Sequence, residues 1–384
     1  MSYALRAGLM VERVDRRPVD SFLLATLVLL VGMGLSVLFS ASYFRADRLF
    51  GEPTYFLRRQ IVWLVLGMFG AITATRVSLD ALRKIIPLLL VPTLVFMLLS
   101  FVPRVGVQVL GARRWIVLFG YSFQPSELVK LCLILYLSHI LSRKREQFHD
   151  PLNAILPPVL VAGFFVALIY AQNDFSTAFF VLLVTLLMFF VSGFPLRYFL
   201  SMTIMSAPIA TILLLSREHR VRRVLAFVDP GRDPAGTGYQ ILASQGALAD
   251  GGLWGVGIGR SVRKLGGLPE AHSDFVFAVL GEEFGYIGVV VVLGLFAMFA
   301  YRGFSLAFRL EDSFRSFLAF GLTAGISLQA ALNMAVVVGM VPATGIPLPF
   351  FSSGGSSIVV SLVMAGLLLN LSRDASVSEG GAHG

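Results

Sequence analysis

The stretch SFLLATLVLLVGMGLSVLFS, residues 21–40, is almost entirely apolar and carries no charged side chain. An α-helix needs about 20 such residues to cross the hydrocarbon core of a bilayer. A polar lead containing Arg13, Arg16 and Arg17 precedes this run, and no cleavable signal peptide is visible. We therefore expect residues 21–40 to form an uncleaved membrane anchor.

The composition extends this interpretation to the whole chain. Of 384 residues, 57% are hydrophobic and only 14% are charged, a balance that excludes an ordinary soluble domain and is typical of a polytopic membrane protein. The single cysteine, Cys132, excludes an intrachain disulfide. We expect an all-α fold.

Ten segments approach or meet the length of a membrane span. The fifth and sixth are separated only by QND, and the sixth and seventh only by GFPLR, so eight or nine spans with one re-entrant piece form the alternative. The fold class is a polytopic integral membrane protein with about ten transmembrane helices in a single membrane domain, residues 20–372. The segments lie at 20–42, 57–75, 85–103, 125–142, 154–172, 175–194, 197–216, 275–301, 315–341 and 356–372.

The placement of basic residues predicts the orientation. Cytoplasmic loops of membrane proteins carry an excess of Lys and Arg, and a cytoplasmic N-terminus places most of the short-loop basic residues inside. The net charge of +9 is then mostly a topology signal and does not indicate nucleic-acid binding. An even number of spans leaves residues 1–19 as a cytoplasmic N-terminal segment and 373–384 as a cytoplasmic tail, which we expect to be disordered.

One loop, at about 217–273 between the seventh and eighth spans, is far longer than the others and would be extracytoplasmic. Loops beyond about 15 residues are usually functional or disordered, and this one is neither low-complexity nor strongly charged. Its apolar residues recur at near-helical spacing from Tyr239 to Leu248 before glycines interrupt them. We predict a short surface helix, a tight glycine turn and a return to the membrane. The GVGIGR spacing indicates turns rather than a dinucleotide site.

Three polar clusters fall on the same predicted outer side, and the first is GARRWIVLFGYSFQPSELVK, residues 111–130. Arg113, Arg114 and Trp115 precede a helix that would begin at Pro125. Glu127 and Lys130 are three residues apart and can pair, so a neutralised ion pair at a helix end is one interpretation. The other is functional, because ionisable groups in a span usually mark a site, and cations near a helix N-terminus favour an anion or diphosphate.

The second cluster is LPEAHSDFVFAVLGEEFG, residues 268–285. Asp274 begins the eighth span and could simply cap it. Glu282 and Glu283 lie two turns deeper and point about 100° apart, so at most one can face a given partner. They are better explained as internal partners that organise helix packing. His272 could titrate near neutral pH, but a solvated loop residue is the favoured interpretation.

The third cluster is NMAVVVGMVPATGIPLPFFSSGGSS, residues 333–357. Its prolines and glycines predict a non-helical loop that is re-entrant or lines a cavity, because irregular backbone at membrane depth is tolerated only where protein or water satisfies it. A plain connector loop is the alternative, but it would be shorter and less apolar. FSSGGSS then begins the last helix with hydroxyl caps. The candidate binding residues here are Ser352, Gly354, Gly355 and Ser356.

Together these clusters closely resemble the signature segments of the SEDS family, which comprises the FtsW, RodA and SpoVE proteins. GIGRSVRKLGGLPEAH followed by GEEFG is more similar to the FtsW/SpoVE branch, since RodA proteins tend to carry Arg where Ala271 stands. The chain departs from the family pattern in QNDFSTA, where Asn173 and Ser176 replace Pro and Gly, and at Ser353, which replaces Tyr. These departures put local geometry in doubt but remove no catalytic group that the family suggests.

The resemblance implies a ten-span peptidoglycan glycosyltransferase of the bacterial cytoplasmic (inner) membrane. Such an enzyme polymerises lipid II, a disaccharide-pentapeptide on undecaprenyl diphosphate, into β-1,4 glycan strands on the outer face during division or wall growth. Asp274 falls on the family aspartate proposed to be catalytic, here as general base. Glu127, Lys130 and Trp115 fall on further family positions. The implied partners are a class B penicillin-binding protein and other divisome or elongasome proteins.

The leaving group would be a diphosphate, so neutralising charge should matter as much as the base. The candidates are Arg113, Arg114, Lys130 and a divalent cation, Mg²⁺ or Mn²⁺, whose ligands the sequence does not identify. Two alternatives stay open: a flippase or transporter of lipid-linked precursors, which ten spans and a broken helix also suit, and a non-catalytic division scaffold. The long outer loop favours the enzyme, because chemistry on a lipid carrier needs a surface outside the membrane.

Overall fold

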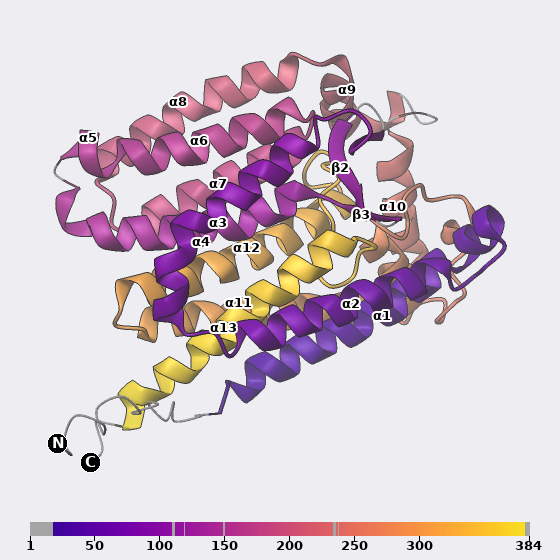
Figure 1. Cartoon of the computed structure of the whole chain (residues 1–384). Coiled ribbons are helices and arrows are strands. Elements are labelled where there is room, and N and C mark those ends of the chain that lie inside the picture. Colours follow the sequence, from indigo (N-terminus) through magenta and orange to yellow (C-terminus); the bar gives the residue numbers. More distant parts are fainter. Residues whose placement is uncertain are drawn as a thin grey trace, which may run out of the picture.

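The computed structural model describes residues 18–380 except 110, 111, 119, 149, 233–235 and 237. Most of the predicted N-terminal segment, Gly111 and the last four residues of the predicted tail therefore lie outside the described residues. The α-helices form a bundle of long, roughly aligned rods, with a small sheet and several short helices at one end (Figure 1).

The elements follow one another in a simple order along the chain. They are α1 (Ser21–Phe50), α2 (Tyr55–Ala74), α3 (Leu79–Leu99), β1 (Gly106–Val109), β2 (Ala112–Leu118), β3 (Tyr121–Phe123), α4 (Pro125–Lys144), η1 (Arg145–Gln147), α5 (Pro151–Ala154), α6 (Leu156–Ala171), α7 (Phe175–Val191), α8 (Leu196–Leu215), α9 (Glu218–Val228), η2 (Pro230–Arg232), α10 (Tyr239–Gly251), η3 (Arg263–Leu265), α11 (Val276–Arg309), α12 (Ser313–Val337) and α13 (Gly355–Gly380).

Every predicted span coincides with an apolar helix. Among the described residues eight helices are long and apolar enough to cross a membrane, while α6 and α7, with 16 and 17 residues, are shorter. The closely spaced fifth, sixth and seventh segments are three separate helices, α6, α7 and α8. The exact number of membrane crossings stays a prediction.

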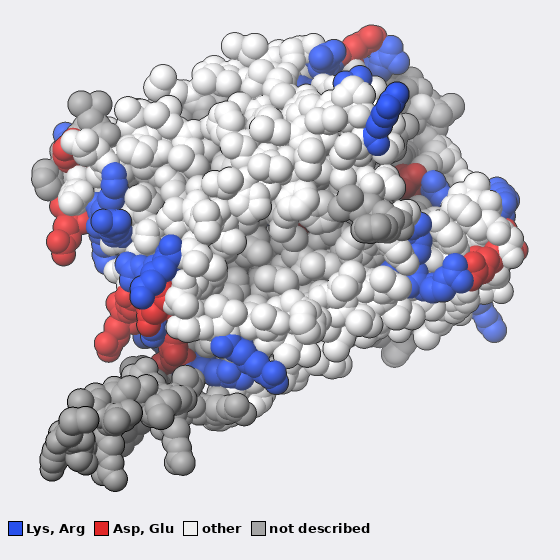
Figure 2. Space-filling model, viewed as in Figure 1, with Lys and Arg blue, Asp and Glu red and all other residues white. Residues whose placement is uncertain are grey.

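The surface has the distribution of polarity that a bilayer requires. Lys, Arg, Asp and Glu gather toward the two ends of the bundle, and the face between them is free of charged side chains (Figure 2). Large apolar side chains of α2 and α8, such as Phe69 and Ile204, are exposed there. A water-soluble monomer rarely exposes so continuous an apolar surface, so this belt supports a lipid environment.

The two ends of the membrane domain meet at one end of the bundle. The backbone N–H of Asp20, just before α1, donates to Ser372 Oγ near the end of the last span at 3.0 Å. Arg302 of α11 also binds Asp20, at 2.9 Å. An even number of crossings places both ends on one side, as this contact requires. Helix α13 continues through Gly380, within the range of the predicted tail.

The core lies around α4, α12 and α13, whose apolar windows are mostly buried, whereas no residue of α8 is buried. Helix α4 packs against α3, α7 and α12, and α13 lies along α2. Helix α8 contacts chiefly α7 and α9, at the edge of the bundle (Figure 1). Helix α4, including its buried first turn, therefore lies at the centre of the molecule.

A small antiparallel sheet, in the order β1-β2-β3, precedes α4 and was not predicted. Its register pairs Gly106 with Ile116 and Ile116 with Phe123. In β2, Ala112 and Ile116 are buried while Arg113 and Val117 are exposed, and a register shift opposite Val107 and Gln108 interrupts the alternation near Arg114. The membrane domain is helical as expected, and this sheet is an addition to it.

The predicted long loop holds α9, η2, α10 and η3 rather than irregular chain. Helix α10 confirms the helix expected from Tyr239 onward and ends at Gly251. The glycines that follow confirm the predicted turn, since Gly255, Gly257 and Gly259 all have positive φ, a conformation that strains residues with a side chain.

Helix α11 is broken at Gly285, whose φ of 65° and ψ of −165° are not helical. The break frees backbone groups, and the loop after α10 satisfies them: Tyr286 N donates to Gly252 O at 2.9 Å, and Val256 N donates to Glu282 O at 3.0 Å. The half-helix Val276–Phe284 is thereby clamped by the extramembrane loop. Asp274 lies at its free end.

Replacing Gly285 with Ala is expected to lower the free energy of unfolding by about 1–3 kcal/mol, because the backbone conformation is nearly exclusive to glycine. A Cβ would also lie 2.3 Å from Gly255 N. Thermal unfolding in detergent measures the loss. Gly294→Ala in the same helix is the matched control, because open space surrounds that position and Ala favours a helix. Equal melting temperatures of the two variants would contradict the account.

Candidate functional site

Asp274 lies in the turn that leads into α11, with its main chain held by α12. Asn333 Nδ2 donates to Asp274 O at 2.9 Å and to Ile346 O at 2.8 Å, which joins this turn to the last loop. Gly345 approaches so closely that a Cβ there would lie 3.3 Å from Asp274 Oδ2. Asp274 is therefore fixed by two segments that are distant in the sequence.

The carboxylate of Asp274 does not cap α11. The residue before α11 is Phe275, and no side-chain cap is formed there. Within the described part of the chain, no hydrogen bond or ion pair to the Asp274 carboxylate is found, although its main chain is well held. The capping role that the sequence allowed for Asp274 is therefore wrong, and the carboxylate is left available to a ligand.

Charges from four elements surround this carboxylate. Burial raises the pKa of Asp274 to about 6, and the nearby Glu270 carboxylate acts in the same direction. Arg114 of β2 and Arg223 of α9 oppose this effect, and Asp174, before α7, adds to it weakly. At pH 7 Asp274 is mostly ionised and is a stronger base than an ordinary aspartate.

The contacts of the two predicted arginines of β2 differ. The pairing of β1 with β2 shifts between Val107 and Gln108, so that Arg114 is an extra residue between Arg113 and Trp115 and strict alternation is interrupted there. Arg114 Nη1 lies 3.3 Å from Asp174 Oδ2, and its charge acts on Asp274, whereas Arg113 is exposed. Arg114 therefore belongs to the site of Asp274, and roles for Arg113 and Trp115 stay predictions.

Asp174 anchors Arg114 because its own carboxylate is fixed by two further hydrogen bonds. Its Oδ1 accepts from Thr177 N at 3.2 Å and caps α7, and its Oδ2 accepts from Gln124 Nε2 at 3.0 Å. The preceding Asn173 has a φ of 63°, a left-handed conformation that Asn tolerates better than most residues. The family's Pro could not adopt this positive φ, so the departure at Asn173 suits the local geometry.

Glu127 and Lys130 confirm the predicted pairing on α4. Their side chains are buried, and Lys130 Nζ lies 2.7 Å from Glu127 Oε2. Lys130 Nζ also donates to Gln329 Oε1 at 2.7 Å and lies 5.3 Å from the centre of the Phe180 ring. Both charged residues line a small cavity between α4, α7, α12 and α13.

This ion pair is linked to Asp274 through one turn of α12. Gln329 binds Lys130 and also donates to Pro347 O at 2.9 Å, while Asn333, four residues later, binds Asp274 O and Ile346 O. Residues four apart on a helix lie on the same face. The Glu127–Lys130 pair therefore supports the loop beside Asp274 without contacting the carboxylate.

The last loop is non-helical from 338 to 354, as predicted, and its hydroxyl groups tie segments together. Ser352 Oγ donates to Ser273 O and accepts from Leu348 N at 2.8 Å. Ser353 N donates to His272 O at 2.9 Å. Ser356 Oγ accepts from Gln124 N at 3.2 Å. Ser352 and Ser353 therefore hold the Asp274 segment in place, and Ser356 ties the start of α13 to the start of α4.

The two predicted glycines have different surroundings. A Cβ at Gly355 would lie 2.1 Å from Trp63 Nε1, so Gly355 provides space for this α2 side chain. A Cβ at Gly354 would meet only Ser357 Cβ, at 3.4 Å. Gly355 thus serves helix packing, and a role in binding for Gly354 stays a prediction.

The favoured interpretation of His272 as a solvated loop residue is wrong. Its side chain is buried, with the ring centre 4.5 Å from that of Phe56. Burial, and then the positive charge of Arg45, lower the pKa of His272 to about 4, so it is neutral at pH 7. Its Nδ1 has no hydrogen-bond partner among the described residues.

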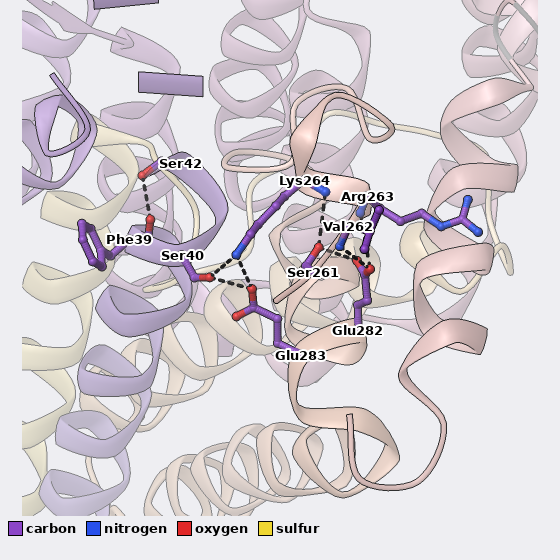
Figure 3. Close-up of polar contacts among 9 residues, drawn as sticks. All are labelled: Phe39, Ser40, Ser42, Ser261, Val262, Arg263, Lys264, Glu282 and Glu283. Carbon is purple, nitrogen blue, oxygen red and sulfur yellow. Dashed lines mark hydrogen bonds and ion pairs between the residues drawn. The ribbon is translucent and has the colours of Figure 1, made fainter. Parts of the chain in front are cut away.

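Glu282 and Glu283 confirm the prediction that they organise packing and face different partners (Figure 3). Glu283 Oε1 binds Lys264 Nζ at 2.7 Å and accepts from Ser40 Oγ of α1 at 2.6 Å, and all three side chains are buried. Glu282 accepts from Ser261 Oγ and from Val262 N. Together they fasten the extramembrane loop to α1 and to the broken helix.

Sequence reasoning missed Arg223, Asp174 and Glu270 as members of the site. Arg223 lies on α9, an amphipathic helix on which the neighbouring Arg220 is buried against the rings of Tyr170 and Phe175. The near-helical spacing of apolar residues in EHRVRRVLAFV is a signal that could have identified α9. No local signal predicts which of its arginines approaches Asp274.

Metal ligands are not clustered in this part of the protein. The described residues hold no group of three or more His, Cys, Asp or Glu side chains that could bind an ion. Near Asp274, the carboxylates of Asp174 and Glu270 already bind arginines. The described residues therefore do not fit a cation cage made by the protein.

A set of long apolar helices with a polar, arginine-containing site at one end of the bundle defines a polytopic membrane protein. The family model described as "Cell cycle protein", which covers FtsW, RodA and SpoVE, matches residues 20–377. The chain belongs to this family.

Curated relatives match along nearly their whole length. A protein of Geobacter sp. (strain M18) named "Probable peptidoglycan glycosyltransferase FtsW" is 40% identical over 353 residues, which cover 92% of this chain and 96% of the relative. A protein of the same name from Borreliella burgdorferi is 39% identical over 354 residues, again 92% and 96% of the two chains.

Solved structures share the fold. One, reported under "Structural coordination of polymerization and crosslinking by a peptidoglycan synthase complex", is similar with a TM-score of 0.77 and 31% identity, covering 93% of this chain and 98% of that chain. The crystal structure of the rod shape determining protein RodA of Thermus thermophilus gives a TM-score of 0.68 at 28% identity, with coverage of 93% and 97%.

Proposed function

We propose that this protein is a peptidoglycan glycosyltransferase that polymerises lipid II into β-1,4 glycan strands. The observation that carries the proposal is the Asp274 carboxylate, which has no hydrogen-bond or ion-pair partner among the described residues. Arg114 of β2 and Arg223 of α9 are close enough to favour its ionised form. Membership of the family and the name of its curated relatives support the same reaction.

In this mechanism Asp274 is the general base. Its carboxylate takes the proton of the acceptor sugar's 4-hydroxyl, and the oxygen attacks the anomeric carbon of the lipid-linked donor. The bond from that carbon to the diphosphate oxygen breaks, and the diphosphate leaves with the electron pair. An α-linked donor gives a β-linked product in this single displacement, so no covalent enzyme intermediate is needed. Proton transfer of this kind typically contributes about 10²–10⁴-fold.

Arginine side chains would neutralise the leaving diphosphate. Arg114 is the best placed of the predicted cations, since it is held by Asp174 and its charge acts on Asp274, and Arg223 is a new candidate because its charge also acts on Asp274. Lys130 already binds Glu127 and Gln329, and Arg113 is exposed on β2. A planar guanidinium matches phosphate oxygens with two parallel hydrogen bonds.

A divalent cation stays a prediction within this proposal. Mg²⁺ commonly uses one or two carboxylates together with substrate phosphates and waters, so the diphosphate would have to supply many of its ligands.

The proposed setting is the bacterial cytoplasmic membrane, with both termini inside and Asp274 on the outer face. The apolar belt and the shared location of the ends of α1 and α13 support this arrangement. The partner would be a class B penicillin-binding protein that crosslinks the strands, together with divisome or elongasome proteins. A related structure is that of a complex reported for polymerization and crosslinking.

A flippase is the alternative function, and the two activities differ in their need for a membrane. Translocation requires a sealed bilayer, whereas polymerisation does not. We expect the purified protein to consume lipid II in detergent and, in sealed vesicles, to leave unpolymerised lipid II on the side where it started. Translocation in vesicles with no polymer in detergent would assign the flippase function instead.

The reaction should fail at acidic pH because the base must be ionised. The pKa of Asp274 is raised to about 6, so kcat/KM should be maintained above that pH and should fall about tenfold per unit below it. Initial rates of polymerisation between pH 4.5 and 8 measure this, with thermal unfolding at each pH to confirm that the protein stays folded. Constant kcat/KM down to pH 4.5 would contradict the assignment of the base.

A further inference from the structure

We propose that Arg45 of α1 and Glu270 form a positioning pair that holds the turn presenting Asp274 and sets the charge beside its carboxylate. This inference rests on the proposed function, in which Asp274 is the base. Neither residue contacts Asp274 through an ion pair, and neither was a candidate from the sequence. The pair acts on the reaction through Asp274.

Glu270 organises the turn with both its main chain and its side chain. Its carbonyl accepts from Ser273 N at 3.0 Å and from Phe275 N at 3.3 Å, and its Oε2 accepts from Ser273 Oγ at 2.9 Å. Asp274 therefore lies between two residues that are both bound to Glu270. The φ of Glu270 is 53°, a left-handed conformation that few residues with a side chain adopt.

Arg45 fixes this turn to a rigid element. Arg45 Nη2 lies 3.0 Å from Glu270 Oε1, and both side chains are about 40% exposed. Helix α1 is itself fastened to the loop by Ser40, which binds Glu283 and Lys264 one turn and a residue before Arg45 (Figure 3). The turn that holds Asp274 is therefore attached to α1 at one edge and to α12 at the other.

The pair also contributes to the electrostatic potential at the Asp274 carboxylate. The negative charge of Glu270 favours the protonated form of Asp274. The positive charge of Arg45 lies 3.0 Å from that of the Glu270 carboxylate and by Coulomb's law opposes its effect. The other charges that act on Asp274 are Arg114 of β2, Arg223 of α9 and Asp174 before α7. These come from other elements and stay unchanged when Arg45 or Glu270 is replaced.

The charges of the pair are constant across the useful pH range. Burial alone would raise the pKa of Glu270, but the Arg45 guanidinium and the Ser273 hydrogen bond outweigh it and hold that pKa below its ordinary value. His272, the next titratable neighbour of Glu270, has a pKa lowered to about 4 by burial and by Arg45. Between pH 5 and 8, Asp274 is thus the group of this turn that titrates.

Two single variants should move the acid limb of the reaction in opposite directions. Glu270→Gln removes a negative charge, so Asp274 ionises more easily and the acid limb of kcat/KM shifts to lower pH, by about half a unit or more. Arg45→Gln removes the positive charge beside Glu270, so the limb shifts to higher pH, by a smaller amount because Arg45 acts on Asp274 less strongly than Glu270 does. The double variant should lie between them. The measurement is lipid II polymerisation by the full chain in detergent.

The positioning role is tested by the polymerisation rate at pH values above the acid limb, where the rate no longer changes with pH (the plateau). The amide oxygen of Glu270→Gln can still accept from Arg45, and its NH2 group can donate to the Ser273 hydroxyl oxygen, so its plateau rate should stay within about threefold of wild type. Glu270→Ala removes both contacts and should lower the plateau by about tenfold or more, with little change in KM. The folded state should survive in each case, because the pair is half-exposed.

The control is a second Arg–Glu pair near the same end of α1. Arg58 Nη1 lies 3.0 Å from Glu52 Oε1, and Arg58→Gln should leave limb and plateau unchanged. The proposal would be overturned if the acid limb of kcat/KM shifted equally in all variants. It would also be overturned if the plateau rate fell while the acid limb stayed at the wild-type pH, and the pair would then have only a structural role. Absence of polymer from the wild-type protein would instead refute the proposed function.

Discussion

The Asp274→Asn variant is expected to lose polymerisation of lipid II by roughly 10²–10⁴-fold, the usual contribution of a general base. Asn has nearly the same size as Asp but cannot take a proton from the acceptor hydroxyl. The bond from Asn333 goes to the main-chain oxygen of Asp274, so it survives the substitution. Initial rates with purified lipid II measure the loss, and thermal unfolding confirms that the fold is retained.

Asp47→Asn is the matched control for this experiment. Asp47 is an exposed carboxylate on α1, with no role in the site. Its replacement should leave the rate unchanged, which separates a local effect at Asp274 from a general effect of lost negative charge. A wild-type rate in the Asp274→Asn variant would refute the base and would require another group to accept the proton.

The Lys130→Met variant is expected to lower the free energy of unfolding by about 3–5 kcal/mol. It leaves Glu127 buried without its cation, and breaking a buried ion pair from one side has this typical cost. The substitution also removes the bond from Lys130 to Gln329, which supports the loop beside Asp274. The measurement is thermal or denaturant unfolding in detergent.

The double variant Lys130→Met/Glu127→Gln separates the charge from the packing. Because no lone charge then remains buried, most of the lost stability should return. Lys84→Met, at an exposed position, is the control and should change stability by less than about 0.5 kcal/mol. If the single Lys130 variant were as stable as wild type, the pair would not be the buried contact that the structure describes.

The helices could be predicted from the sequence because length and apolar content alone decide them. The run at 21–40 forms the N-terminal two thirds of α1, and the near-helical spacing after Tyr239 forms α10. The sheet was missed because its strands have only four, seven and three residues, too short to show a pattern. The break at Gly285 depends on contacts with Gly252 and Val256, which no local signal reveals.

The site divides in the same way between local and distant contacts. Glu127 and Lys130 are three residues apart on one helix, so their pairing follows from helical geometry. Arg45 and Glu270 are 225 residues apart, and Arg114 and Asp174 come from different elements, so these pairs need the fold. Resemblance identified Asp274, but the sequence alone could not exclude a capping role or show that His272 is buried.

The most direct test of the central claim is the product that the purified protein makes from lipid II in detergent, where there is only one phase and no membrane to cross. Our account predicts glycan strands that a muramidase cuts to disaccharide units, formed by the wild-type protein, alone or with a class B penicillin-binding protein, and not by Asp274→Asn. Lipid II recovered intact from the wild-type protein under both conditions would contradict it.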